Sequence, residues 1–231
     1  MFEIEYNGET SSFHGIMIQS RPNIPAPVRN IEVVEIPGRD ESLYQAADIA
    51  YDDITITVEM GFHTPQNRWG MKARQVKQWL SGDGKLKFSD DPEYFYLVKT
   101  IELGEIERKI RRAGIFEVDF VCSPFCYPED GTLEKTIDEV KYNPYMLCHP
   151  VYKITGNGQC TLTVNGKSMS ADVAQNITID TERMLAYRQD GTWQNTAVTG
   201  DYESLYLEHG DNSISITSGF SLIVVPQWRC L

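Results

Sequence analysis

Strict alternation of apolar and polar residues constrains this chain more than any other feature of its sequence. Between Ile54 and Met60 every even-numbered residue is apolar, and every odd-numbered residue is Thr or Glu. A period of two is typical of a strand with one buried face. Further strand-like runs occur at 85–88, 94–99, 103–114, 115–122, 151–154, 159–164, 176–180, 204–207, 213–217 and 221–225. The sequence therefore predicts a mainly β fold.

One segment has helical spacing instead. Thr64 can cap a helix, Pro65 suits the first helical position, and apolar residues then recur with a helical period. These residues are Trp69, Ala73, Val76 and Leu80. A Ser-Gly-Asp-Gly run at 81–84 ends the pattern. We expect a single α-helix over residues 65–80.

Length and turn chemistry predict two domains. The 231 residues exceed a typical domain of roughly 100–150 residues, and one large β domain is the alternative. After Gly131 arginine becomes scarce and short alternating runs follow one another at the spacing of an antiparallel sandwich. We place the domains at 1–131 and 132–231, with 132–145 as a lead-in segment. Within the second domain, Asn165-Gly166 predicts a two-residue hairpin turn.

The chain is acidic. Its 33 acidic and 21 basic side chains give a formal net charge of −12, and residues 1–131 hold 22 acidic and 14 basic side chains, a net charge of −8. This balance argues against non-specific binding to the phosphates of nucleic acids. Acidic residues close to Met1 and the lack of a long apolar run predict neither a secretory signal nor a membrane span, and hence synthesis in the cytoplasm.

Cysteines and histidines form no local metal motif. The five cysteines follow no regular framework, so we expect reduced, mostly buried thiols, with Cys122 on a core face. Neither Cys122 with Cys126 nor Cys148 with Cys160 has the second pair that a structural zinc needs. The histidines at 14, 63, 149 and 209 have no ligand at zinc spacing. No metal or cofactor is predicted, and a site assembled only in the fold is the alternative.

No set of catalytic residues emerges. Gly166-Lys167-Ser168 matches the end of a phosphate-binding loop, but Thr161 stands where that loop needs glycine, and the fragment lies between two predicted strands. The acid pairs Asp52-Asp53 and Asp90-Asp91 suit turns better than acid–base catalysis. No Gly-x-Ser-x-Gly elbow is present. The sequence predicts a non-enzymatic building block of a larger assembly.

Two surface features have both a binding and a structural interpretation. The basic run from Glu107 to Arg112 has no interleaved aromatics, which favours a solvated hairpin or a subunit contact over nucleic-acid binding. If exposed, Trp193 or Trp228 could stack on a sugar, whereas a buried tryptophan is the commoner case. A carbohydrate-binding module is therefore the alternative function. A cell-wall hydrolase, which rests on scattered carboxylates alone, is the weakest hypothesis.

A series of segments occurs in a recognisable order. In the first half these are IPGRD at 36–40 followed by Leu43-Tyr44, VKQWL at 76–80, KLKFSDDP at 85–92 and FEVDFVCSPF at 116–125. In the second half they are PVYKITGNG at 150–158, NITIDTE at 176–182, GDY at 200–202, and GDNSI at 210–214 leading to PQWR at 226–229. Together they resemble the distal tail protein (Dit) family of bacteriophages with long, non-contractile tails. The resemblance spans almost the whole chain.

This resemblance implies an N-terminal split β-barrel with one α-helix and a C-terminal galectin-like antiparallel β-sandwich. It also implies a hexameric ring in the virion that joins the tail tube to the tail tip or baseplate and surrounds a channel for DNA. Expected partners are further copies of the chain, the major tail tube protein, a tail-associated protein of the tip and a receptor-binding protein, with no membrane and no specific nucleic acid. No large inserted arm or added carbohydrate module is seen, which argues against direct receptor binding. An acidic first domain is compatible with a channel lining that repels DNA.

The candidate ring interface is a loop in the first domain. Its residues are Ile36, Pro37, Gly38, Arg39, Leu43 and Tyr44. Pro37-Gly38-Arg39 is typical of a turn between the extended runs 31–36 and 43–44, and a protruding hairpin that reaches a neighbouring subunit would use such a sequence. An ordinary internal hairpin is the alternative.

Overall fold

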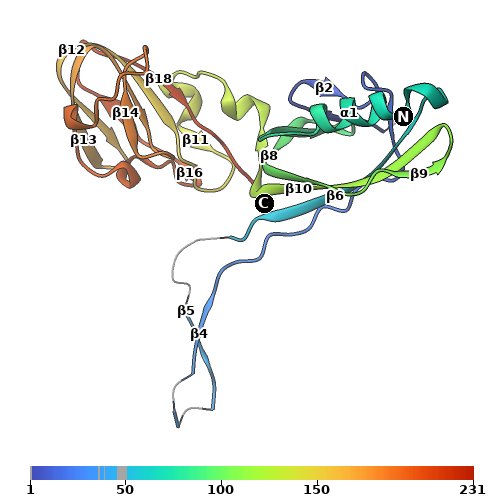
Figure 1. Ribbon diagram of the computed structural model, residues 1–231. Helices are drawn as coiled ribbons and strands as arrows, with labels where there is room; N and C mark the ends of the chain where they lie inside the picture. The colour runs from blue at the N-terminus through green and yellow to red at the C-terminus, as the bar shows by residue number, and fades with distance from the viewer. Residues whose placement is uncertain (1, 36, 39, 46–50) are drawn as a thin grey trace. The chain divides into compact units, whose positions relative to one another are not determined.

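The computed structural model describes residues 2–35, 37–38, 40–45 and 51–231 (Figure 1). Contacts divide the chain into two compact units, one of residues up to Cys126 together with Leu231, and one of Tyr127–Cys230. Both units consist mainly of strands, and α1 (Trp69–Trp79) is the single α-helix in the described part of the chain. The predicted mainly β fold with one helix is confirmed. The predicted domain ranges, 1–131 and 132–231, stay a prediction about independent folding.

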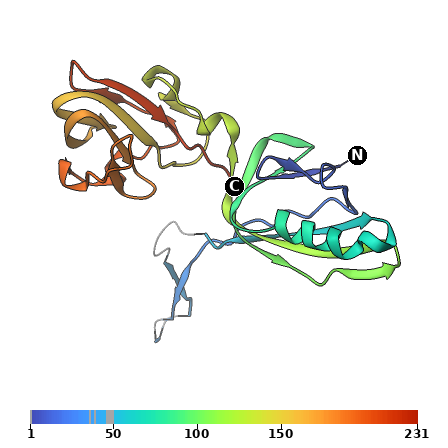
Figure 2. The ribbon, with the colours of Figure 1, turned by 45° about the horizontal axis from the view of Figure 1, so that its top comes forward.

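An antiparallel sheet forms the frame of the first unit. Its strands lie in the order β2-β1-β7-β8-β10-β6-β3, and β9 pairs with β10. Their bounds are β1 (Ile4–Tyr6), β2 (Glu9–Thr10), β3 (Ile16–Ile18), β6 (Ile54–His63), β7 (Gly84–Phe88), β8 (Asp91–Leu103), β9 (Glu107–Ile110) and β10 (Ala113–Pro128). The sheet curls around its apolar face, which α1 covers (Figure 2). It is the curved half-barrel that a split barrel requires.

The alternation at 54–60 has the predicted consequence. The even-numbered side chains of this stretch are buried, and the odd-numbered ones are exposed. On β10 the facing residues repeat the pattern, since Val58 lies opposite Val118 and Ile54 opposite Cys122. Cys122 is fully buried, as predicted, and its burial raises the pKa of the thiol to about 12. These two strands therefore supply the centre of the first core.

The helix begins later than predicted. Residues Gln66–Arg68 form a 3-10 turn, and α1 follows from Trp69. The predicted cap at Thr64 is wrong, because Pro65 stands at the cap position and no side chain caps the turn. The apolar stripe packs on the sheet through Val76, Trp79 and Leu80. The helix ends at Trp79, one residue before the predicted end, and the N–H of its cap residue Leu80 donates to the Val76 carbonyl at 2.9 Å.

A long hairpin organises the second unit. Strands β12 (Val151–Val164) and β13 (Lys167–Asp180) pair along all fourteen residues of each. The turn between them is Asn165-Gly166, with φ of 50° and 79°, so the predicted two-residue hairpin is confirmed. Strand β12 also pairs with β17 (Ile214–Ile216) and β18 (Ser221–Val225). Strand β13 also pairs with β14 (Leu185–Tyr187) and β15 (Val198–Thr199). The predicted runs 151–154 and 159–164 thus belong to one strand.

One predicted strand of the second unit is wrong. Residues Tyr202–Leu205 form a 3-10 helix, in which the Ser204 N–H donates to the Asp201 carbonyl at 3.0 Å. Leu205 and Leu207 are both buried. Two apolar residues separated by a single residue also fit the alternation of a strand, which explains the wrong prediction. A 3-10 helix, Glu129–Thr132, leads into the segment 132–145. This segment holds a second 3-10 helix, Ile137–Val140, and β11 (Tyr142–Asn143), which pairs with β16 (Gly210–Asp211).

The second unit begins and ends side by side. The Gln227 N–H donates to the Gly131 carbonyl at 2.8 Å, and Lys135 pairs with Val224 across a β-bridge. A Cβ atom on Gly131 would lie 2.9 Å from the Trp228 backbone nitrogen, so this approach needs glycine. Among the described residues, no helix is long and apolar enough to cross a membrane.

Candidate assembly interface

The predicted interface loop belongs to a separate hairpin. Strands β4 (Glu32–Val34) and β5 (Leu43–Gln45) pair with each other, Val33 opposite Tyr44, and neither pairs with another strand in the described part of the chain (Figure 1). At the base, Arg29 and Tyr51 form a β-bridge. We call the described residues of 20–52 the arm. The arm joins β3 to β6.

The structure tests the site residues only in part. Pro37 and Gly38 are exposed in a turn, where Gly38 has a φ of +86°, and Tyr44 is 70% exposed. Leu43 is the first residue of β5. Ile36 and Arg39 lie outside the described residues. That these residues form a ring interface stays a prediction.

Apolar side chains along the arm have no core to enter. No described side chain of the arm is buried, and five of the exposed ones are large and apolar. They are Ile24, Val28, Ile31, Val33 and Tyr44. A two-stranded hairpin is marginal by itself, and exposed apolar groups that follow one another along a segment mark an interaction surface. Sequence reasoning missed Ile24 to Val33, although Pro22, Pro25 and Pro27 signal a stretch that cannot join a sheet centre.

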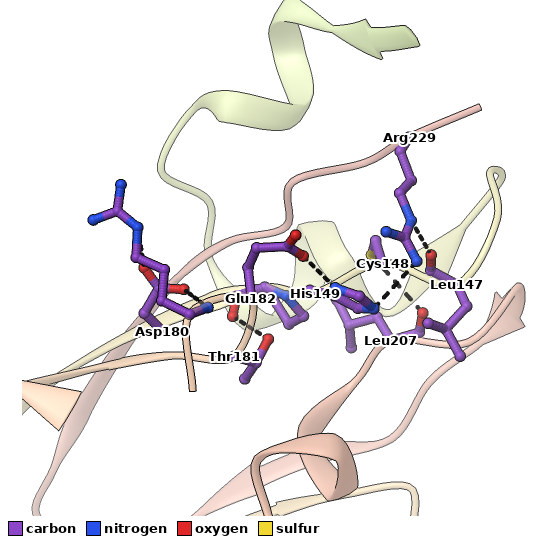
Figure 3. Close-up of polar contacts among 10 residues, drawn as sticks. Leu147, Cys148, His149, Asp180, Thr181, Glu182, Leu207 and Arg229 are labelled. Carbon is purple, nitrogen blue, oxygen red and sulfur yellow. Dashed lines mark hydrogen bonds and ion pairs between the residues drawn. The ribbon is translucent and has the colours of Figure 1, made fainter. Parts of the chain in front are cut away.

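A polar cluster in the second unit is the one place where a histidine, a carboxylate and an arginine meet among the described residues (Figure 3). Nδ1 of His149 bonds Glu182, and Nε2 of the same ring lies 3.2 Å from Nη2 of Arg229. The ring also stacks on Tyr206 at 4.1 Å. Because both ring nitrogens are occupied, His149 has no free nitrogen for a substrate.

Contacts and burial in this cluster shift the pKa values of its titratable side chains. The hydrogen bond from His149 lowers the pKa of Glu182, while burial raises the pKa of Tyr206. The neighbouring Cys148 thiol is buried, and burial raises its pKa to about 12. A thiol held protonated is a poor nucleophile. The cluster therefore fastens the end of the chain to the start of β12 and the end of β13.

The remaining candidates stay apart. His14 bonds Glu9 at 2.7 Å, and Nδ1 of His209 lies 2.8 Å from the Tyr145 carbonyl oxygen. Within the described ranges, no three His, Cys, Asp or Glu side chains come close enough together to hold a metal ion. Of the acid pairs, Asp53 binds Lys99 at 2.6 Å and Asp90 binds Arg21 at 3.3 Å.

The other fragments are placed as follows. Gly166-Lys167-Ser168 lies at the tip of the β12–β13 hairpin, as interpreted from the sequence. The basic run forms the exposed β9–β10 hairpin, with Arg108 over the Trp69 ring at 5.2 Å. Trp228 is buried, with 8% exposed, whereas Trp193 is 74% exposed. Of the two tryptophans, only Trp193 is available to stack on a ligand.

This chain has a curled sheet covered by one helix, an arm, and a second β unit built on one long hairpin. As a whole its fold is similar to that of proteins from bacteriophage hubs and baseplates. One such neighbour is the Dit protein of phage SPP1, described as a paradigm of the hub adsorption apparatus in phages that infect Gram-positive bacteria. Its crystal structure matches all of this chain over all of its own length, with a TM-score of 0.73 and 12% identity. The predicted resemblance to distal tail proteins is confirmed at the level of the fold.

Two further structures show the same similarity at lower scores. Chains of the phage P2 baseplate in its activated conformation match with TM-scores of 0.54 in the Ca form and 0.52 in the Sr form. Identities are 7% and 8%, over 96% of this chain and 97% and 96% of those chains. No family model and no curated protein matches the sequence.

Proposed function

We propose that this chain is a non-enzymatic structural subunit of a bacteriophage tail hub. Its copies form a ring, hexameric as the sequence resemblance implies, that joins the tail tube to the tail tip and lets DNA pass. One observation carries the proposal: the SPP1 Dit hub protein shares the fold over the full length of both chains. The arm supports it, since its exposed apolar side chains need cover that another chain provides.

In the proposed ring, the arm of one subunit lies on its neighbour. Val28 is 66% exposed, and Val33 faces Tyr44 across the hairpin. Burying such side chains at an interface removes apolar surface from water at about 25 cal/mol per Å². Pro37 and Gly38 at the turn of the hairpin would then belong to the same contact as the two valines.

The outer face of the first sheet supports the passage of DNA. Glu59 lies directly opposite Glu117 on paired strands, and Asp119 accepts a hydrogen bond from Thr57 at 2.5 Å. Like charges placed opposite each other weaken a sheet. Acidic side chains on a channel wall would repel the phosphates of DNA instead of binding them. We assign this face to the channel.

Light scattering and electron microscopy of the full chain test the ring. We expect a closed ring for the natural sequence, and monomers for a Val28→Asp, Val33→Asp variant. Both substitutions are exposed, so the free energy of unfolding should change by less than about 0.5 kcal/mol per site. Leu133→Asp, an equally exposed apolar position in the second unit, is the matched control and should assemble normally. A natural chain that stays monomeric at high concentration, even with tail partners, refutes the proposal.

Charge reversal tests the channel face. A Glu59→Lys, Glu117→Lys variant should acquire double-stranded DNA binding at low salt, measured as retarded electrophoretic migration of the DNA. The control carries the same change in net charge on exposed acids of the second unit, Glu203→Lys and Glu208→Lys. Equal DNA binding by both variants would show that net charge alone is responsible and that this face has no special role.

A further inference from the structure

The outer face of the second unit carries a row of side chains in register. Ile223 on β18 lies opposite Lys153 on β12, which lies opposite Thr178 on β13. Thr178 in turn faces Tyr187 on β14, and Tyr187 is bridged to Trp193. Directly opposed residues point to the same side of a sheet. The row therefore crosses the sheet and ends on two aromatic residues.

A groove runs beside this row. One hollow of about 360 Å³ is lined by all of the row except Trp193 and by six further residues, Glu134, Ile154, Thr155, Asn176, Ile177 and Gln189. A second hollow of about 340 Å³ lies between Ala174 and Asp190. Asn176 and Gln189 line both hollows, so the two form one elongated groove. Its length suits a chain-like ligand better than a compact one.

Groups along the groove have hydrogen-bonding capacity to spare. Asn176 accepts the backbone N–H of Gln189 through Oδ1 at 2.8 Å. Neither the Nδ2 group of Asn176 nor the side-chain amide of Gln189 bonds to another residue in the part of the chain that is described. Lys153 and Glu134 form an ion pair at 2.6 Å, with both side chains partly exposed. Donors and acceptors thus alternate over a short distance, as recognition of hydroxyl groups requires.

Trp193 supplies an aromatic platform at the end of the row. Its 74% exposure is unusual for a residue whose apolar surface favours burial. The bonds from Arg188 N–H to Thr192 O at 2.8 Å and from Gln194 N–H to Ala186 O at 2.7 Å flank the Tyr187–Trp193 pair. The pair is therefore a non-hydrogen-bonded one, in which side chains approach closely. Tyr187 and Trp193 lie together on the groove side.

The chemistry of the lining identifies the occupant. Nucleic acid is disfavoured, because Lys153 and Arg188 are balanced by Glu134 and Asp190 in a chain of net charge −12. A protein interface would have an apolar centre, whereas in this groove hydroxyl, amide and charged groups alternate with the apolar side chains of Tyr187 and Ile223. A sugar ring offers C–H faces to an aromatic platform and hydroxyl groups to amides. We propose that this groove, together with Trp193 beside Tyr187, binds a neutral polysaccharide chain, such as a host surface presents.

This inference goes beyond the hub function and is independent of ring formation. Binding is measured with the full chain on neutral oligosaccharides of four or more hexose units, by glycan array and by tryptophan fluorescence. Fluorescence is suitable because Trp193 is far more exposed than Trp79 or Trp228. We expect binding by the natural sequence and a roughly tenfold weaker affinity for Trp193→Ala. Gln189→Ala should also weaken binding, and Trp193→Phe should retain part of it.

Ile110→Ala, an exposed apolar truncation in the first unit, is the control and should bind normally. Circular dichroism confirms that each variant is folded. Three outcomes overturn the proposal: no binding of neutral oligosaccharides by the natural chain, binding that Trp193→Ala leaves unchanged, or binding of anionic polymers alone. A loss of self-association in Trp193→Ala, without any glycan binding by the natural chain, would assign this face to a protein contact instead.

Discussion

The β4–β5 and β12–β13 hairpins follow the same pairing rules and differ in what covers them. In β12–β13, fourteen residues of each strand pair, and one face of the hairpin enters a core with Tyr152 and Leu162 fully buried. In β4–β5 only three pairs form, and Val33 and Tyr44 stay exposed. A hairpin acquires stability from what packs on it rather than from its ladder. The long hairpin is thus stabilised within the chain, whereas the short one stays exposed.

The largest expected difference between the two hairpins is in the free energy of unfolding after an apolar side chain of each is truncated. Leu162→Ala removes a buried side chain and should lower the free energy of unfolding of the second unit by about 3 kcal/mol. Val33→Ala should lower it by less than about 0.5 kcal/mol, because Val33 is 51% exposed and belongs to no core. Chemical denaturation measures both. A large effect of Val33→Ala on a monomer would show that the arm packs on its own subunit.

The turn glycines give a second, smaller contrast. Gly166 has a φ of +79° and Gly38 a φ of +86°, and a Cβ at either position would meet no other atom within 4 Å. Alanine at Gly166 should therefore cost about 1 kcal/mol through backbone strain alone. The same strain at Gly38 should leave the unfolding free energy unchanged and weaken ring assembly, which light scattering measures. Equal destabilisation by the two substitutions would contradict the contrast between the hairpins.

The smallest expected effect on the free energy of unfolding comes from the polar contact that joins the two strands of each hairpin at the end away from the turn. His149 and Glu182 pair just outside β12 and β13, whereas the arm is closed by Asn30 and Asp52 at 3.3 Å. Because the pKa of Glu182 is lowered in the folded state, its contribution is present above the ordinary glutamate range and is lost as pH falls through the lowered value. Glu182 is about half exposed, so Glu182→Gln should cost less than about 1 kcal/mol at neutral pH.

Thermal unfolding followed from neutral to acidic pH tests this expectation. The difference between Glu182→Gln and the natural chain should vanish at the acidic end, where the glutamate is protonated in both states. Asp52→Asn is the matched change in the arm and should have no effect on unfolding at any pH. A difference for Glu182→Gln that persists in acid would mean that the side chain acts through packing rather than charge.

Sequence patterns predicted the parts of the fold that local chemistry determines. Alternation gave the correct buried face of β6, and Asn165-Gly166 gave the correct turn, because both signals are complete within a few residues. The strand expected at 204–207 failed, since two buried leucines fit an extended run and a 3-10 turn equally well. The capping role predicted for Thr64 also failed, because the helix is preceded by a 3-10 turn at Gln66–Arg68 that places Pro65 at the cap position.

The candidate sites were less predictable. Pro37-Gly38 predicted the turn of the arm. The exposure of Val28 and Val33 could not be predicted, because it depends on whether another part of the chain covers them, and a local sequence pattern does not contain that information. The groove was harder still. Lys153, Thr178 and Tyr187 are distant in sequence and come together only through strand order and register. Single-residue cues such as Trp193 point to a surface without identifying the residues that complete it.

The hydrogen bond between Gly131 and Gln227 brings the two ends of the second unit together. A unit whose two ends coincide can be removed, lengthened or exchanged without stretching the chain on either side. It also tolerates new ends, and the exposed tip at Asn165-Gly166 is a natural place to open the chain in a circular permutant. Recombination at this junction would therefore replace the whole second unit in a single event.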